Sequence, residues 1–369
     1  MKILFDHQIF SFQKYGGISR YFYVLASRIN KTSNKVLVDG KYSNNVYIGK
    51  LKKNTKQFLP RFNFPYKNVV LFYLNNIFDS KNLKKGNFDL LHVTYYHPYF
   101  LKYLKGKPYI VTVYDMAHEL FSGEVKGLVD KTIKYKRETI CGASKIIAIS
   151  ENTKKDLIRL YGIPENKIEV IYLGNPLEGA KPLKIDNLPD KYLLFVGNRK
   201  GYKNFDFFVK TVTPIIKNDK NLHLVCAGGG KFSREENKLL SELKISNQVK
   251  QISFRNDNEL AYIYKNALVY VLPSLYEGFG MTALEAFSMG CPVVASNTSS
   301  IPEVCGKAAV YIDPENVKSL IGGIEKVIYN GDLRGKLIKI GFEQVKKFSW
   351  KKTTRDTLLI YNKIVRNGR

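Results

Sequence analysis

Residues 268–290 read LVYVLPSLYEGFGMTALEAFSMG, and this stretch decides which fold the chain is expected to adopt. The run 268–274 is apolar and rich in β-branched residues, which is typical of a strand buried on both faces. A glycine-containing turn follows, and 281–290 has the pattern of a helix that ends at a glycine. Two carboxylates, Glu277 and Glu285, lie on either side of the helix start. A strand, a polar loop and a helix in this order predict a parallel α/β sheet that binds ligands where its strands end.

The same alternation of strands and helices runs through all 369 residues. Helical patterns such as 151–162 separate the apolar runs, so the chain is predicted to be α/β, with parallel sheets covered by helices on both faces. The predicted strands are 2–7, 35–40, 88–96, 109–115, 145–150, 168–174, 192–198, 222–229, 249–254, 268–274 and 291–297.

The pattern restarts after residues 175–192, a proline-containing stretch without strong periodicity, which we interpret as a linker. The run 192–198 then resembles the first strand of a second domain. We therefore predict two Rossmann-like domains, 1–173 and 174–352, with a cleft between them.

The charge balance narrows the choice of partner. Lysine and arginine outnumber aspartate and glutamate by 59 to 32, a net charge of +27, and residues 1–173 carry 29 basic against 13 acidic side chains. Such a surface favours nucleic acid, anionic lipid or phosphate-bearing substrates, although a lysine-rich genome would produce the same excess. The segment 50–68 mixes basic and aromatic residues, which suits a membrane interface and equally an ordinary solvated loop.

Cysteines and apolar runs indicate the compartment. Cys141, Cys226, Cys291 and Cys305 are scattered without metal-type pairing, as expected for free thiols in a reducing compartment. The opening residues read as a strand rather than as a secretion signal. Since no apolar run reaches the roughly 18 residues of a spanning helix, we expect a cytoplasmic protein.

Two loops of the first half contain candidate functional residues. Gly16 and Gly17 open a helix, where paired glycines let backbone approach a ligand and leave N–H groups for an anion, or simply form a tight turn. Without GxGxxG, this loop argues against a dinucleotide enzyme. Asp115 and His118 follow the strand 109–115 and could position or exchange protons; a helix-capping aspartate and a surface histidine would look the same.

The first loop of the second half is basic. Arg199, Lys200 and Lys203 precede an amphipathic helix whose N-terminus adds a positive dipole, so they could cradle a diphosphate. A solvated basic loop is the alternative. The loop lacks GxxxxGK[ST], so it is not a P-loop.

The opening stretch completes the predicted site. The backbone amides of Phe279 to Thr282 lie between Glu277 and Glu285, at the positive end of the helix dipole. An anion on these amides would have a carboxylate on each side, ready to accept hydrogen bonds from hydroxyl groups. A sugar–diphosphate–ribose has that layout, so we interpret the carboxylates as acceptors rather than as an acid and a base.

Over nearly its whole length the chain resembles the retaining family 4 glycosyltransferases of the GT-B fold, which build bacterial surface polysaccharides. The resemblance rests on a set of motifs and is specific in their combination. They are YGGISRY, HVTYYHP, TVYDM, AISENTKKDLIRLYGIPENKIEVIYLG, FVGNRKGYKNF, PSLYEGFGMTALEA, CPVVASNTSSIPEVCGKAAVYIDP and FSWKKTTRDTLLIY.

The resemblance implies roles for the domains. Residues 1–173 would bind the acceptor and 174–352 the nucleotide-sugar donor, while the helix at about 353–369 would pack back on the first domain. Gly16 and Gly17 would face the diphosphate or the acceptor, and Ser150 and Glu151 would end a strand at the cleft.

It also implies roles for residues of the donor site. Arg199 and Lys203 would hold the diphosphate, Glu277 the transferred sugar and Glu285 the ribose. Base recognition would fall to Phe254 and Arg255. The amides of Gly278, Phe279, Gly280, Met281 and Thr282 would face the phosphates.

The implied reaction moves a sugar from a nucleotide diphosphate to an acceptor hydroxyl with retention, without a cofactor or a metal. GDP-mannose or a related GDP-sugar is slightly favoured over a UDP-sugar, because GNRKGYKNF is similar to the motif of mannosyltransferase-like members. The acceptor would be a glycan or a lipid-diphosphate-linked glycan of O-antigen or capsule synthesis, met at the anionic inner membrane.

Many members of the family carry His-Asp where this chain has Tyr114-Asp115, so the acceptor-side roles of Asp115 and His118 stay open. A sugar-nucleotide epimerase or phosphorylase of the same fold, a nucleic-acid-binding protein and a catalytically inactive scaffold are the alternatives. The carboxylate pair Glu277 and Glu285 argues against the epimerase or phosphorylase. A cleft lined by carboxylates would repel nucleic acid, which is a polyanion, and this argues against the nucleic-acid-binding protein. The catalytically inactive scaffold is disfavoured because the chain keeps Arg199, Lys203, Glu277 and Glu285 together.

Overall fold

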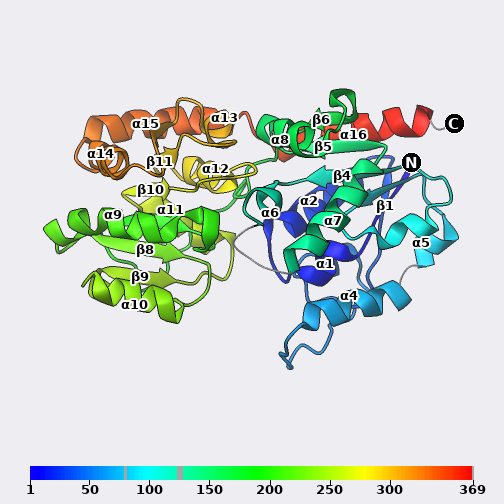
Figure 1. The fold of residues 1–369 in the computed structure, drawn as a ribbon, viewed down its shortest axis with the longest axis horizontal. Coiled ribbons are helices and arrows are strands. Elements are labelled where there is room, and N and C mark those ends of the chain that lie inside the picture. Colours follow the sequence, from blue (N-terminus) through cyan, green and yellow to red (C-terminus); the bar gives the residue numbers. More distant parts are fainter. Residues whose placement is uncertain (79–80, 123–127, 368–369) are drawn as a thin grey trace. The chain divides into compact units, whose positions relative to one another are not determined.

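The computed structural model describes residues 1–78, 81–122 and 128–367. The chain divides into two compact units: unit 1 comprises Met1–Leu173 and Trp350–Arg369, and unit 2 comprises Gly174–Ser349. Each unit has one six-stranded parallel sheet with helices packed on it (Figure 1). The prediction of an α/β protein with two parallel sheets is confirmed.

The sheet of unit 1 has the strand order β2-β1-β3-β4-β5-β6, in which the direction of winding reverses between β1 and β3. Ile3 of β1 lies opposite Val36 on one side and Leu90 on the other, so apolar side chains are in register across the middle of the sheet. This order is that of flavodoxin-like folds, extended by one strand. The strands are β1 (Lys2–Phe5), β2 (Lys35–Val38), β3 (Leu90–Val93), β4 (Tyr109–Val113), β5 (Lys145–Ala148) and β6 (Ile168–Val170).

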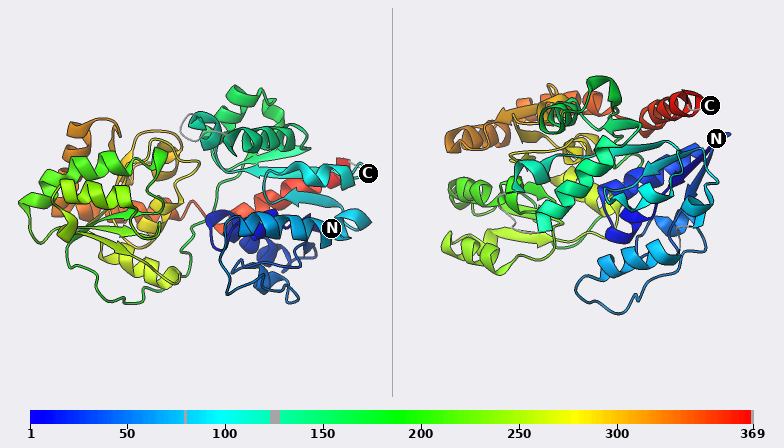
Figure 2. Two further views of the ribbon diagram at one scale, coloured as in Figure 1. Left: turned by 60° about the horizontal axis from the view of Figure 1, so that its bottom comes forward. Right: turned by 45° about the vertical axis from the view of Figure 1, so that its right-hand side comes forward.

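The C-terminal helix α16 (Trp350–Asn367) packs on α2 (Gly17–Ile29) of unit 1 (Figure 2). Tyr361 lies 2.5 Å from Nδ1 of His92 on β3, and burial lowers the pKa of His92 to about 3, so this histidine is neutral. Thr353 donates to the carbonyl of Tyr172, at 2.7 Å. The remaining helices of unit 1 are α1 (Gln8–Phe12), α3 (Ile48–Leu51), α4 (Lys67–Phe78), α5 (Lys81–Lys85), α6 (Ala117–Leu120), α7 (Leu128–Cys141) and α8 (Glu151–Tyr161), with 3₁₀ turns η1 (Pro98–Tyr103) and η3 (Glu165–Lys167).

The sheet of unit 2 has the order β12-β11-β10-β7-β8-β9, so its winding reverses between β7 and β10. The strands are β7 (Tyr192–Val196), β8 (His223–Ala227), β9 (Val249–Ile252), β10 (Val269–Leu272), β11 (Val293–Ser296) and β12 (Ala309–Ile312). The predicted strands did not include β12. It lies at the edge of the sheet and is only half-buried, although its residues 308–312, AAVYI, are all apolar.

The core of unit 2 lies between its sheet and two amphipathic helices. Phe208 and Val212 of α9 and Ile324 of α14 are buried against Leu193 and Leu224 of the sheet. The helices of unit 2 are α9 (Phe205–Asn218), α10 (Arg234–Glu242), α11 (Asp257–Asn266), α12 (Met281–Ser288), α13 (Ile301–Cys305), α14 (Val317–Ile328) and α15 (Gly331–Val345), with 3₁₀ turns η4 (Gly201–Lys203) and η5 (Ser246–Gln248).

Two further sequence observations bear on the fold. The structure buries Cys226, Cys291 and Cys305, whereas Cys141 is exposed, and all four are free thiols. Within 1–78, 81–122 and 128–367, none of the helices combines the length and the apolar character that crossing a bilayer requires.

Candidate active site

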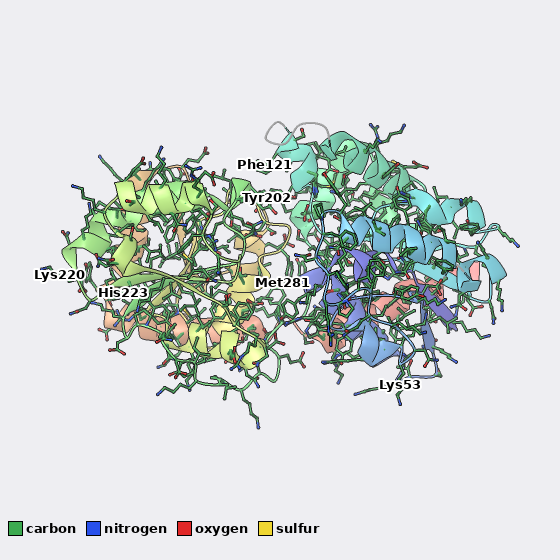
Figure 3. The ribbon with its side chains drawn as sticks, turned by 90° about the horizontal axis from the view of Figure 1, so that it is seen from below. Lys53, Phe121, Tyr202, Lys220, His223 and Met281 are labelled. Atoms are coloured by element: carbon green, nitrogen blue, oxygen red, sulfur yellow. The ribbon has the colours of Figure 1, made fainter. Side chains whose placement is uncertain are left out.

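The reversal between β7 and β10 defines the candidate site of unit 2. In an open parallel sheet, the loops on either side of such a reversal diverge at the carboxyl ends of the strands and leave a crevice. The loop after β7 and the loop after β10 are tied together here: the amide of Leu275 donates to the carbonyl of Tyr202, at 2.8 Å, and Asn204 donates to the carbonyl of Pro273, at 3.2 Å. Tyr202 and Met281, which belong to these two segments, are labelled in Figure 3.

Lys203 and Glu277 form an ion pair across this reversal. The Lys203 ammonium lies 2.8 Å from each carboxylate oxygen of Glu277. The two side chains are 25% and 12% exposed, so both are shielded and both still reach solvent. The structure thus brings together two residues that are 74 positions apart and that were predicted to share a site.

Three neighbouring groups fix the position of Glu277. Ser274 donates to its Oε1 at 2.7 Å, Ser300 donates to its backbone carbonyl at 2.8 Å, and its own amide donates to Ser299 at 2.9 Å. A carboxylate held from several directions loses little conformational entropy when it accepts a further hydrogen bond.

The helix α12 begins directly after this loop. Gly280 has a left-handed backbone (φ 93°) that turns the chain into the helix, and no side chain caps the N-terminus. Glu285 lies in the second turn and accepts a hydrogen bond from Tyr264, at 2.9 Å. Burial and the charge of Glu285 raise the pKa of Tyr264 well above its usual value, so this phenol stays protonated and donates.

Gly278, Phe279, Met281 and Thr282 lie in the same loop and helix start. The hydroxyl of Tyr270 donates to Thr282 at 2.7 Å, and the ring of Phe279 is buried. The free N-terminus of α12 thus lies between Glu277 and Glu285, as the sequence predicted.

Arg199 is placed differently from the prediction of a phosphate contact. Its side chain is 3% exposed and pairs with Glu236 of α10, 13% exposed, with Nε 2.7 Å from Oε1. It also donates to the carbonyls of Gly228, Gly230 and Lys231, at 3.1 Å each. The guanidinium of Arg199 therefore links the loop after β8 with the helix α10. In this structure Lys203, and not Arg199, contacts Glu277.

The loop after β8 is a part of the site that the predictions did not include. Gly228, Gly229 and Gly230 all have left-handed backbones, with φ of 75°, 68° and 77°. A side chain on Gly229 would collide with the carbonyl of Gly197, because the loops after β7 and β8 touch there. Three successive glycines after a strand were the available signal.

The predicted base-binding residues lie beside this glycine loop. The ring of Phe254, after β9, lies 3.5 Å from where a side chain on Gly228 would begin. The guanidinium of Arg255 turns to Glu259 of α11, at 2.6 Å, while most of its side chain stays in solvent. The structure thus places Phe254 next to the glycine loop, and it places Arg255 against the helix that follows.

Unit 1 has a reversal of its own between β1 and β3, and polar residues join the two loops there. Asp6 accepts from the amide of Thr94 at 2.8 Å and from Gln8 at 2.7 Å. The amide side chain of Gln8 in turn accepts from the amide of His97 at 2.8 Å. These buried hydrogen bonds fix the loops that follow the two strands.

A groove of about 730 Å³ lies at this edge of unit 1. Most of its lining is aromatic or aliphatic, with histidine and lysine at a few points, which is the composition of many ligand sites. Its lining comprises Ile9, Phe12, Gln13, Val69, Phe72, Tyr73, Tyr95, Tyr96, His97, His118, Lys131, Thr132 and Tyr135. Sequence reasoning placed only His118 among the functional residues, since the groove joins segments from residue 9 to residue 135.

Asp115 and His118 have different surroundings. Asp115 accepts from the amide of Ala117 at 3.1 Å and so stabilises the start of α6, which was the alternative interpretation of this residue. His118 is exposed at the groove. Behind them, the fully buried Lys136 donates to the Asp115 carbonyl at 2.7 Å and to Glu119 at 2.9 Å. This ion pair, which the sequence did not predict, holds the segment in place.

The other predicted residues of unit 1 lie at helix starts. Gly17 is the first residue of α2, and Gly16 precedes it with an extended backbone. Ser150 caps α8 by accepting from the amide of Thr153 at 3.0 Å, and Glu151 begins that helix. Their contacts with a ligand stay predictions.

Two family models match the chain, and their matches follow one another along it. Residues 15–178 match Glycosyltransferase Family 4, and residues 183–344 match Glycosyl transferases group 1.

Relatives and solved structures agree with these matches. An uncharacterised glycosyltransferase of Methanocaldococcus jannaschii is 27% identical over 297 residues, 74% of this chain and 75% of the relative. The O-antigen chain mannosyltransferase B of Escherichia coli is 28% identical over 237 residues, 61% of this chain and 62% of the relative. The sucrose-phosphate synthase of Thermosynechococcus elongatus superposes with a TM-score of 0.79 at 19% identity, over 99% of both chains, which shows a shared fold.

Proposed function

Since the chain belongs to the GT-B glycosyltransferases, with a family 4 domain followed by a group 1 domain, we propose that it transfers a sugar from a nucleotide diphosphate to a glycan hydroxyl with retention of configuration. The observation that carries the proposal is the pairing of Lys203 with Glu277 at the sheet reversal, directly before the free N-terminus of α12.

Each of these groups matches a part of a nucleotide-sugar. The positive end of α12 and the Lys203 ammonium attract a diphosphate. Glu277 would accept from hydroxyls of the transferred sugar, and Glu285, one to two turns into the helix, from those of the ribose. The glycine loop after β8 lies beside Phe254, and we place the nucleoside there.

The residues present would promote departure of the diphosphate. Negative charge grows on the leaving phosphate in the transition state, and Lys203 with the amides of α12 would stabilise it. The acceptor hydroxyl would attack from the face the phosphate leaves, and the phosphate oxygen would take its proton. Chain residues then position the reactants and stabilise charge, so we propose that the reaction needs no metal.

For the donor we favour GDP-mannose or a related GDP-sugar, with a UDP-sugar as the alternative. The support is the motif GNRKGYKNF and the likeness to a curated mannosyltransferase. For the acceptor, we propose a glycan of surface polysaccharide, bound at the aromatic groove of unit 1. We also propose a lipid-diphosphate link and a peripheral position on the inner membrane, and the support for both is the basic charge of residues 1–173.

The donor site is tested by measuring nucleotide binding by the wild type and by two variants that each lack one lysine. Thermal-shift titrations with GDP, UDP, ADP and dTDP should stabilise the wild type with one base preferred. Lys203→Met should lose at least tenfold in affinity, whereas Lys210→Met, which removes an exposed lysine of the helix α9 that follows the loop, should bind as the wild type does. Equal binding by all three proteins would contradict the assignment, and an inverted anomeric signal in the NMR spectrum of the product would contradict retention.

A further inference from the structure

Two polar side chains in the groove of unit 1 have hydrogen-bonding roles that the structure fixes. They are Gln13, which lies shortly before the start of α2, and His97, which directly precedes the 3₁₀ turn η1. Most of the lining around them is aromatic. In a groove of this kind a small number of fixed polar groups decides which ligand binds.

The first of these groups is the imidazole of His97. Its Nδ1 accepts a hydrogen bond from the backbone amide of Tyr99, at 3.1 Å, and so caps η1. Burial lowers the pKa of His97 below its usual 6.5, although the charge of Asp6 opposes this, so the ring is neutral at pH 7. A neutral imidazole carries one proton, which must then lie on Nε2. This Nε2–H group has no hydrogen-bond partner among the residues that the structure describes.

The His97 ring is held in one orientation. Its centre lies 4.8 Å from that of Phe72 and 4.7 Å from that of Tyr135, so aromatic rings pack against it. The buried side chain of Gln8 accepts from the backbone amide of His97 at 2.8 Å and donates to its carbonyl at 3.1 Å. Gln8 also donates to Asp6 at 2.7 Å. A donor that is fixed before the ligand arrives loses little conformational entropy on binding.

The second group is the side-chain amide of Gln13. Its Oε1 accepts from the backbone amide of Ser19 in α2, at 3.2 Å, so the amide is oriented and its Nε2 is the donor that remains. Within 1–78, 81–122 and 128–367, this Nε2 has no hydrogen-bond partner. A side chain on Gly16 would begin 2.5 Å from Oε1 of Gln13. Glycine at this position therefore leaves the space that the Gln13 amide occupies.

Two N–H donors between aromatic walls indicate the chemistry of the ligand. A purely hydrocarbon ligand would cover both donors without pairing them, which costs free energy. The half-buried rings of Phe12 and Tyr95 also line the groove, with their centres 5.7 Å apart. The negative faces of such rings attract the C–H groups on one face of a pyranose. A pyranose also carries oxygen atoms around its edge, where the two donors could reach them.

We propose that the groove of unit 1 binds a pyranose, and that Gln13 and His97 determine its specificity by donating from Nε2 to oxygen atoms of the sugar. That this sugar belongs to the acceptor rests on the proposed function, whereas the binding itself does not. Under the proposed function, the two donors would select acceptors by the position and orientation of their oxygen atoms.

Saturation-transfer NMR on the full chain tests the binding directly. The probes are the methyl α-pyranosides of mannose, glucose, galactose and N-acetylglucosamine, each measured alone and with GDP or UDP added. We expect at least one of them to bind. Saturation should be strongest for the C–H protons on one face of its ring, because that face would lie on the aromatic side chains.

Two substitutions of His97 separate ligand binding from helix capping. His97→Asn keeps an oxygen acceptor for the amide of Tyr99 but removes the Nε2 donor, so it should melt with the wild type and bind the glycoside about fivefold more weakly. His97→Gln places an amide nitrogen near Nε2 but loses the cap. It should recover most of the affinity and melt about 3 °C lower.

Gln13→Glu applies the same reasoning to the second donor. It keeps an acceptor for the amide of Ser19 and replaces the amino group by an oxygen, so the glycoside should again bind about fivefold more weakly. His223→Asn, at the start of β8 in unit 2, is the matched histidine control (Figure 3). This control should bind the glycoside as the wild type does, and none of the four variants should change the affinity for GDP or UDP.

Three results would overturn the proposal. The first is that the wild type binds none of the methyl pyranosides; if it then binds geraniol, an isoprenoid chain is the occupant of the groove. The second is wild-type affinity in both His97→Asn and Gln13→Glu. The third is that affinity follows the melting temperature, with His97→Gln weak and His97→Asn normal, because His97 would then only cap η1. Nucleotide binding without glycoside binding refutes this proposal alone, and glycoside binding without nucleotide binding refutes the proposed function alone.

Discussion

The substitution Glu236→Gln decides whether Arg199 stabilises unit 2 or contacts the substrate. In the structure Glu236 supplies the only carboxylate within hydrogen-bonding distance of the Arg199 guanidinium among the described residues, at 2.7 and 3.3 Å. The amide of glutamine keeps the size and one acceptor oxygen but removes the charge. A buried cation would then remain without its counter-ion, and we expect unit 2 to lose stability.

The size of the effect follows from burial. The Arg199 side chain is 3% exposed, and removing one partner of a buried ion pair costs about 3–5 kcal/mol. The lower value applies here, since three backbone carbonyls still accept from Arg199 and the glutamine oxygen can still accept from the amide of Ser233 in the capping box of α10. For a unit of this size, about 3 kcal/mol corresponds to a melting temperature lower by roughly 6–12 °C.

Thermal unfolding followed by circular dichroism measures this loss, with Glu235→Gln as the matched control, because Glu235 is an exposed neighbour in the same helical turn. The control should change the melting temperature by less than about 2 °C. Turnover per folded molecule should stay within about threefold of the wild type in both variants, about 0.6 kcal/mol of barrier.

The pH dependence gives a second reading. Burial opposes ionisation of Glu236, but hydrogen bonds from Arg199 and from the amide of Ser233 outweigh it and lower its pKa. A carboxyl whose pKa is lower in the folded state stabilises the fold above its unfolded pKa, about 4.3, and loses that contribution as the pH falls through its folded pKa. The gap between wild type and Glu236→Gln should therefore be full at pH 7 and close below about pH 4.

A specific pair of results would refute this assignment. If Glu236→Gln melts with the wild type while Arg199→Lys melts normally and loses turnover, Arg199 acts at the phosphates, as the sequence alone suggested. If Arg199 is structural, Arg199→Lys should be destabilised as well, because a single ammonium cannot replace a planar guanidinium that donates to four partners.

Three further outcomes follow from the site. Glu285→Ala should raise KM for the donor about tenfold with little change in kcat, and a loss confined to kcat would contradict a ribose contact. Gly229→Ala should destabilise by about 1–3 kcal/mol in denaturant titrations, since its φ is left-handed and a side chain would meet the Gly197 carbonyl; unchanged stability would contradict that close contact. Turnover should persist in excess EDTA, whereas a loss restored by manganese would refute metal independence.

Much of the fold could be predicted from sequence because buried parallel strands leave continuous apolar runs. Of the twelve strands in the described residues, eleven were predicted, and the half-buried edge strand β12 was missed although its run AAVYI (308–312) is as apolar as those that were included. The strand order could not be predicted in the same way, since it depends on which strands pair after each crossover. The reversal between β1 and β3 in unit 1 and that between β7 and β10 in unit 2 leave no local pattern.

The candidate site was predictable where its parts are close in sequence. Glu277, Gly280 and Glu285 share one strand–turn–helix, and spacing alone places the helix N-terminus between the carboxylates. The pairing of Arg199 with Glu236 could not be predicted, because Glu236 lies 37 residues away on another helix; the phosphate contact of Arg199 stays a prediction. A basic residue in a loop looks the same in sequence whether it turns to a ligand or to a buried carboxylate.

The pairing of Lys203 with Glu277 leads to a last prediction. The ammonium contacts both carboxylate oxygens at 2.8 Å, so a donor diphosphate must compete with Glu277 for Lys203. Removing the negative charge of Glu277 should weaken that competition and also remove repulsion between the carboxylate and the phosphates. The same carboxylate is the proposed acceptor for sugar hydroxyls, so turnover should suffer.

Glu277→Gln should therefore bind the nucleoside diphosphate without sugar at least as tightly as the wild type, while its kcat falls at least a hundredfold, about 2.7 kcal/mol of barrier. Calorimetry with the preferred nucleotide and a product assay measure the two effects. Glu303→Gln, a half-buried carboxylate in the short helix α13 of unit 2, is the matched control and should change neither. A parallel loss of nucleotide affinity and turnover would mean that Glu277 holds the phosphate-binding loop rather than the sugar, because only then would the lysine be misplaced by the same substitution.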